Sequence, residues 1–154
     1  MPGAASVVLC ALSMLGRSAE TLPPIVLVDV PPPGVSQRAE GFTDGFVIFL
    51  VTSSHGFRFA VDRAQRAAPH CGEHGTVAKV ASVIVHEEWH IRHGGDERGA
   101  YDAQTMALLQ LGFGLESPIV RGVRASMQTV LKAQRAAGRA HVDTRGPSAD
   151  EPGL

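Results

Sequence analysis

Residues 83–91 have the sequence VIVHEEWHI and place two histidines four positions apart in a segment that is typical of an α-helix. On a helix, His86 and His90 lie about one turn apart along the axis and about 40° apart around it, so both imidazoles can reach one ion. Glu87 falls on the same side. Zinc binds neutral imidazole nitrogens and, at catalytic sites, keeps one position for water. The spacing predicts a zinc site in which Glu87 takes a proton from that water. A solvated polar helix face or a structural metal site would have the same spacing.

A third ligand has to come from the residues that follow the motif. In an unbroken helix Glu97 would lie about 10 Å beyond His90 along the axis, which is too far for one ion. We expect Gly94 and Gly95 to end the first helix, because glycine favours the left-handed conformation found after a helix C-terminus. Asp96 is typical of the residue that caps a new helix. Glu97 would then face back toward the imidazoles as the third zinc ligand.

The pattern His86-Glu87-x-x-His90 followed by Glu97-x-x-Ala100 resembles the zincin metallopeptidases, and among them the gluzincins. In gluzincins the third ligand is a glutamate on the following helix. The resemblance is closest to the minimal gluzincin-type domains. It implies one zinc ion held by His86, His90 and Glu97, with Glu87 as the general base.

The resemblance covers about residues 44 to 111 and has two departures. The family usually has an uncharged residue at the position of Glu88 and an apolar residue at the position of Arg92. Neither departure touches the ligands. In zincins a strand lies above the active-site helix, and its free edge pairs with an extended substrate. The resemblance implies this role for residues 44–52.

Three further residues are candidates for a supporting role. A tetrahedral intermediate needs a hydrogen-bond donor for its oxyanion, and Tyr101 and His93 are the nearby donors in the sequence. Packing and a solvated helix end are the respective alternatives. Asp102 is a candidate to accept a hydrogen bond from a ligating imidazole, or it is an exposed helix carboxylate.

Two functions follow from the motif. The first is a zinc-dependent peptidase that acts on a peptide or protein substrate through Glu87. The second is a non-catalytic zinc-binding module, in which the same ligands stabilise a small fold or a protein contact. Nucleic acid is not an expected partner, because the 154 residues carry a formal net charge of only -1. We interpret the basic residues of the last helix as a solvated face: Arg121, Arg124, Lys132, Arg135 and Arg139.

Residues 4–15 form an apolar run that is too short to span a bilayer, so no stable membrane insertion is expected. We expect residues 1–19 to be a secretory signal, which would export the protein to the periplasm or the medium. A buried first helix of a cytoplasmic protein is the alternative. If the segment is removed, Cys10 goes with it and Cys71 has no partner in the chain, which excludes a disulfide framework.

The remaining pattern predicts an α+β fold, with a small zincin-like domain over residues 20–139. We expect a short mixed sheet packed on the motif helix, a glutamate-bearing helix and a C-terminal helix. The polar residues 140–154 are predicted to be a disordered tail. The expected strands are residues 25–30 and 44–52, and the expected helices are residues 57–68, a motif helix from residue 75 or 76, residues 96–111 and residues 117–139.

Overall fold

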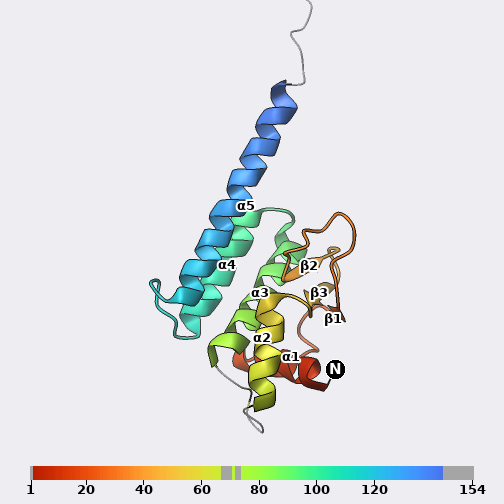
Figure 1. Cartoon of the computed structure of the whole chain (residues 1–154), viewed down its shortest axis with the longest axis vertical. Helices are drawn as coiled ribbons and strands as arrows, with labels where there is room; N and C mark the ends of the chain where they lie inside the picture. The colour runs from red at the N-terminus through yellow and green to blue at the C-terminus, as the bar shows by residue number, and fades with distance from the viewer. Residues whose placement is uncertain (1, 67–70, 72–73, 144–154) are drawn as a thin grey trace, which may run out of the picture.

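The computed structural model describes residues 2–66, 71 and 74–143, and within them it confirms a small α+β domain with five helices and a three-stranded mixed sheet. Figure 1 shows helix α3 at the centre, with the sheet on one side and helices α4 and α5 on the other. In chain order the elements are α1 (Pro2–Met14), β1 (Ile25–Val28), β2 (Gly41–Thr43), β3 (Ile48–Val51), α2 (His55–Arg66), α3 (His74–His93), α4 (Glu97–Gln110) and α5 (Pro118–Asp143).

The sheet has the order β1-β3-β2, with β1 parallel and β2 antiparallel to β3. The prediction of one strand over residues 44–52 is wrong in its first half. Asp44 accepts hydrogen bonds from the backbone N–H groups of Phe46 and Val47, both at 2.9 Å, and Gly45 has a φ of 97°. These bonds form a turn, so the chain makes a hairpin and residues 41–43 pair with β3.

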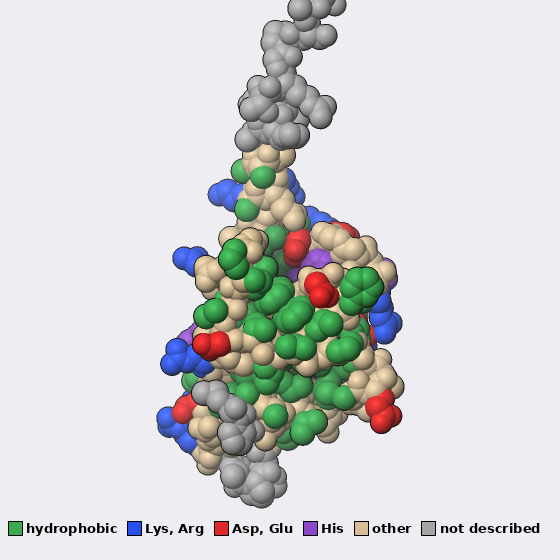
Figure 2. All heavy atoms as spheres, turned by 90° about the vertical axis from the view of Figure 1, so that its right-hand side faces the viewer, with side chains coloured by type: hydrophobic (Ala, Val, Ile, Leu, Met, Phe, Trp, Pro, Cys, Tyr) green, Lys and Arg blue, Asp and Glu red, His purple; other side chains and the backbone are tan. Residues whose placement is uncertain are grey.

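The sheet leaves apolar side chains on the surface. Figure 2 faces the side of the molecule that carries the sheet and shows a broad hydrophobic area there. Val26 of β1, Val30 and Phe46 are among the exposed large hydrophobic side chains of the described residues. On the same sheet, the rings of Phe42 and Phe49 stack across the β2–β3 pair at a centroid distance of 4.8 Å.

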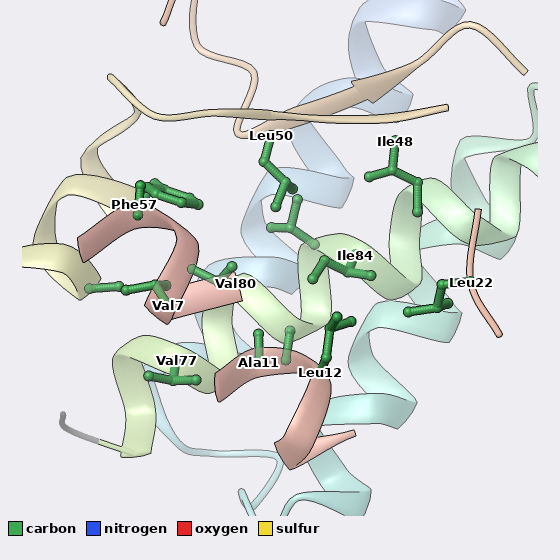
Figure 3. Packing of buried hydrophobic residues seen from close by; sticks show 14 residues of the cluster. Val7, Ala11, Leu12, Leu22, Ile48, Leu50, Phe57, Val77, Val80 and Ile84 are labelled. Atoms are coloured by element: carbon green, nitrogen blue, oxygen red, sulfur yellow. The ribbon is translucent and has the colours of Figure 1, made fainter. Parts of the chain in front are cut away.

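Helix α3 is buried on nearly all sides, because it contacts α1, α2, α4, β2 and β3. Its buried stripe consists of Val77, Val80, Ala81 and Ile84, which are at most 4% exposed. In Figure 3, Ile84 and Val80 lie between side chains of β3 on one side and of α1 on the other. The motif is therefore held by the main hydrophobic core of the described residues.

The N-terminal segment is part of that core. Val7 and Ala11 of α1 have no exposed surface, and they pack with α3. This packing corresponds to a buried first helix, which is the alternative to a secretory signal for this segment. Cys10 of α1 forms a disulfide with Cys71, so in the whole chain Cys71 has a partner.

The helix boundaries follow the predicted signals closely. Helix α2 covers most of the expected range, α4 ends before Gly112, which has a φ of 95°, and α5 begins at Pro118. Helix α5 continues to Asp143, beyond residue 140 where the tail was expected to begin, and its end projects past the rest of the molecule (Figure 1). Residues 144–154 lie outside the described residues. None of the described helices combines the length and apolarity needed to cross a membrane.

The two departures from the gluzincin pattern form one ion network. Glu88 is buried at 4% exposure and pairs with Arg17, which follows α1, and with Arg92, one turn further along α3, at 2.6 Å. A buried carboxylate needs such partners, because desolvation of an unpaired charge costs several kcal/mol. The network therefore explains how α3 tolerates a charge at this position and ties α3 to the segment after α1.

Replacing Arg17 should destabilise the domain. We expect Arg17→Ala to lower the free energy of unfolding by about 1–2 kcal/mol, since Glu88 stays buried with one partner instead of two. The matched control is Arg66→Ala, because Arg66 pairs with the half-exposed Asp62 at 3.2 Å and should contribute no more than about 0.5 kcal/mol. Urea unfolding of both variants measures the difference, and equal losses would contradict the role given to the buried carboxylate.

Candidate metal centre

A tight turn joins α3 to α4 and sets the direction of the second helix. Gly94 has a φ of 84° and its N–H donates to the carbonyl of His90 at 2.8 Å. Only glycine adopts this conformation without strain, so the predicted break in the helix is confirmed. Asp96 is the N-cap residue of α4 as predicted, although its side chain makes no capping hydrogen bond.

The two helices approach very closely just beyond the turn. A Cβ atom at Gly99 would lie 2.3 Å from the ring of Trp89, so this position has to be glycine if the ring is to stay in place. Ala100, the small residue of the Glu97-x-x-Ala100 pattern, is fully buried. The need for glycine at position 99 depends on where the Trp89 ring lies, so it could not be recognised from the sequence.

The hairpin brings together the three predicted ligands. The Nε2 atoms of His86 and His90 are 3.2 Å apart, and each lies 3.5 Å from an oxygen of the Glu97 carboxylate. Ligand atoms bound to a tetrahedral zinc at its usual bond lengths are about 3.3–3.4 Å from one another. The three side chains are thus arranged to hold a metal ion.

Hydrogen bonds on the far side of each ring fix the imidazoles. His90 donates from Nδ1 to the carbonyl of Gly94 at 2.7 Å, and His86 donates from Nδ1 to the side-chain oxygen of Gln104 at 3.1 Å. Each bond leaves Nε2 directed toward Glu97. A ligating histidine needs such a partner, since it selects the tautomer and the ring orientation.

Gln104 is a supporting residue that the sequence analysis missed. It is buried at 3% exposure, and its amide nitrogen donates to the hydroxyl of Ser82 at 3.1 Å, which in turn donates to the carbonyl of Lys79 at 2.7 Å. This chain fixes which end of the amide faces His86. The signal for Gln104 in the sequence is that a polar residue stands two turns after Glu97, on the same face of the helix that packs against α3. Asp102, the predicted acceptor for a ligating imidazole, is exposed.

The charges at the centre are strongly coupled. Hydrogen bonds from His86 and His90 lower the pKa of Glu97 to about 2, and the bond to Glu97 raises the pKa of His90 to about 9. A proton on His90 therefore balances the Glu97 carboxylate at neutral pH. Burial raises the pKa of Glu87, with the two imidazoles acting in the opposite direction.

The remaining predicted residues lie at different distances from the centre. Tyr101 packs its ring edge-on against His86 at a centroid distance of 4.6 Å. The ring of His93 stacks on Trp89 at a centroid distance of 4.4 Å, and its Nδ1 donates to the carbonyl of Trp89. The side chain therefore caps the C-terminal end of α3. Glu87 is 6% exposed and borders the same cleft as the ligands.

A cleft of about 910 Å³ opens above the three ligands. One wall is the segment of residues 35–45, which includes β2, and the opposite wall comes from α5 between residues 125 and 130. The strand beside the cleft is not the one we expected. β3 pairs on both sides and has no free edge, whereas β2 is an edge strand that contacts α3.

The edge strand runs directly over the motif helix. A Cβ atom at Gly41 would lie 2.8 Å from Val83 and 3.2 Å from the side chain of Glu87. Gly41 is therefore required for the close approach of β2 to α3. The predicted strands, residues 25–30 and 44–52, do not include Gly41.

Comparisons with protein-family models, with curated proteins and with solved structures give no match for this chain. The functional interpretation therefore depends on the geometry described above.

Metal binding should depend on pH through His90. Zinc binds the neutral imidazole, and the proton on His90 is lost only near pH 9, so protons compete with the metal below that value. We expect the apparent zinc affinity to fall about tenfold for each pH unit between pH 9 and pH 7. Competition with a chelator of known affinity measures this slope. An affinity that does not change over this range would contradict the proton–metal exchange.

Gln104 should matter for metal binding, and Asp102 should not. We expect Gln104→Leu to weaken zinc binding about 10- to 100-fold, because His86 loses the acceptor that orients it. Asp102→Asn is the matched control, since this exposed side chain lies on the same helix. Chelator competition at one pH compares the two variants, and an equal effect of both would reject the role given to Gln104.

Proposed function

We propose that this chain is a zinc-dependent metallopeptidase of the gluzincin type. The observation that carries the proposal is the convergence of two imidazoles and a carboxylate beside a second, buried carboxylate, with all four facing one cleft. His86, His90 and Glu97 would hold the ion. Glu87 would act as the general base.

The sequence motif supports zinc. Two histidines and one carboxylate also form the facial triad of non-haem iron, but two histidines four apart on one helix with a glutamate after the first are the pattern of zinc peptidases. The two Nε2 atoms lie 3.2 Å apart and each lies 3.5 Å from a different oxygen of Glu97, which is compatible with one ion. Zinc, when bound, would supply a Lewis acid that lowers the pKa of a water molecule and polarises a carbonyl group.

Glu87 is suited to move the proton. It would accept a proton from the attacking water and pass it to the leaving nitrogen of the cleaved peptide bond. Its burial raises the pKa of the carboxyl group, which brings it closer to the pH at which a general base is most effective. Because Gly41 lies against its side chain, Glu87 is shielded from solvent on the side of the edge strand.

Tyr101 is suited to donate a hydrogen bond to the developing oxyanion. Burial, followed by repulsion from Glu97, Glu40 and Glu87, raises the pKa of its phenol to about 12. The hydroxyl group therefore keeps its proton at neutral pH and remains a donor. The ring borders the cleft and contacts His86, so the donor belongs to the same helix hairpin as the ligands.

The edge of β2 is suited to align the substrate. An extended peptide can add to an exposed strand through backbone hydrogen bonds. In this fold the role that the resemblance gave to residues 44–52 would pass to Gly41–Thr43, the edge strand above α3.

An oxidising compartment is part of this proposal. The Cys10–Cys71 disulfide supports it, because structural disulfides persist mainly outside the cytosol. The packing of α1 into the core supports retention of this helix in the working protein.

Replacing Glu87 should separate catalysis from metal binding. We expect Glu87→Gln to lower the rate of peptide cleavage by about 10²- to 10⁴-fold while the bound zinc stays at one ion per chain, because the amide cannot accept the proton. Glu116→Gln, an exposed carboxylate on the loop before α5, is the matched control. Cleavage of a broad peptide library and zinc content are measured on protein purified without an affinity tag.

The outcomes distinguish the two functions. Cleavage that disappears in Glu87→Gln and survives in Glu116→Gln supports the peptidase. A wild-type protein that holds zinc and cleaves nothing in the library favours the non-catalytic module. Absence of zinc from both the wild-type protein and a His86→Ala variant would reject a metal site altogether.

A further inference from the structure

The two ends of the cleft differ in chemistry. At one end Gly94 and Gly95 line the cleft, and a Cβ atom added to either would meet no other atom within 4 Å. At the other end the ammonium group of Lys79 pairs with the carboxylate of Glu40 at 2.8 Å. Both residues border the cleft, and their side chains are 25% and 33% exposed.

The ion pair borders its end of the cleft and is supported by residues on its far side. A Cβ atom at Gly56 would lie 2.5 Å from a carboxylate oxygen of Glu40, so α2 supports the glutamate directly. Behind the pair lie the core residues Leu50, Phe57 and Val80. A substrate peptide that enters the cleft and runs toward Lys79 therefore meets the charged pair at this end and finds no apolar opening there.

The direction of the edge strand decides which end of a peptide faces this pair. Glu40 directly precedes β2, so the ion pair lies at the N-terminal end of that strand. A peptide that adds to β2 in the more stable antiparallel sense has its C-terminal part at this end. The residues that follow the cleaved bond would then extend from the metal centre toward Lys79.

The distance allows a short segment only. Lys79 precedes His86 by two turns of α3, about 10 Å along the helix axis. An extended peptide covers this distance in about three residues. The end of the substrate would thus meet the ammonium group soon after the cleaved bond.

We propose that Lys79 binds the C-terminal carboxylate of the substrate, which makes the protein a peptidase that removes two or three residues from the C-terminus of a peptide. This inference rests on the proposed function. An ammonium group has three donors, and Glu40 occupies only part of this capacity while it holds Lys79 in position. Because Glu40 already neutralises the charge, the preference for a free carboxylate should be moderate, about tenfold.

The test compares peptides with a free and an amidated C-terminus. Two pools of randomised, N-acetylated hexapeptides, one with each end, are incubated with the zinc-loaded protein, and the products are identified by mass spectrometry. We expect release of fragments of two or three residues, with the free-acid pool cleaved about ten times faster. In Lys79→Met this ratio should fall to about one.

The chain offers a matched control, because its only other lysine is Lys132, which is exposed on α5. Lys132→Met should keep the tenfold ratio. Zinc content and thermal unfolding of each variant show that the centre and the fold are intact. A ratio of one in the wild-type protein, or a tenfold ratio that persists in Lys79→Met, would overturn the proposal and leave the ion pair with a structural role.

A binding measurement separates failure of this inference from failure of the proposed function. Zinc-loaded Glu87→Gln protein is mixed with the same two pools, and the retained peptides are quantified by mass spectrometry. Enrichment of free acids that disappears in the Glu87→Gln/Lys79→Met double variant supports recognition by Lys79, even if the wild-type protein cleaves nothing. Equal retention of acids and amides by the Glu87→Gln protein would reject it.

Discussion

The position of the Glu97 carboxylate relative to the two imidazoles depends on the turn between α3 and α4. The helix itself fixes the spacing of His86 and His90, but the third ligand belongs to another helix and needs a defined crossing. The left-handed Gly94 sets the direction of the chain, and the absence of a side chain at Gly99 lets the helices approach. Because metal–ligand bonds tolerate errors of only about 0.2 Å, these glycines are as necessary for the site as the ligands themselves.

Three glutamates close together on α3 and α4 have different surroundings, and this divides their roles. Glu97 lies between two imidazoles, which keep it ionised and suited to bind a metal. Glu88 is paired with Arg17 and Arg92, so its charge stabilises the link between α3 and the N-terminal segment. Glu87 is buried, and neither an arginine nor a lysine is among the groups that shift its pKa. Burial raises that pKa. Because burial raises the pKa of Glu87 while the imidazoles lower that of Glu97, Glu87 is the better suited of these two to accept a proton as a general base.

The sequence predicted the helices and the convergence of His86, His90 and Glu97 well because their signals are local. The ends of α3 and α4 depend on Gly94, Asp96 and Gly112, and each acts on its own turn of backbone. The sheet was harder to predict. The strand at Gly41–Thr43 has three residues, and its pairing with β3 is decided by the turn at Asp44 and by contacts with α3. Strand pairing joins residues distant in sequence, so an apolar run alone does not give its register.

Gln104 and Gly41 could not be assigned from the sequence for a similar reason. Gln104 accepts a hydrogen bond from His86 directly and is oriented by Ser82, and neither Gln104 nor Ser82 has a recognised spacing from the motif. Gly41 is necessary only because β2 crosses α3 at one point. Both requirements arise from the tertiary packing, whereas the spacing of His86 and His90 arises from one helix.

Gly41 also connects two properties of the centre that would otherwise be independent. A side chain here would collide with Val83 and Glu87, so it would move the edge strand away from α3. The gap would expose the Glu87 carboxylate to water and remove part of the burial that raises its pKa. The same displacement would move the strand edge on which a peptide backbone can pair. The close approach of one glycine therefore sets both the basicity of the proposed base and the distance at which a substrate would lie above it.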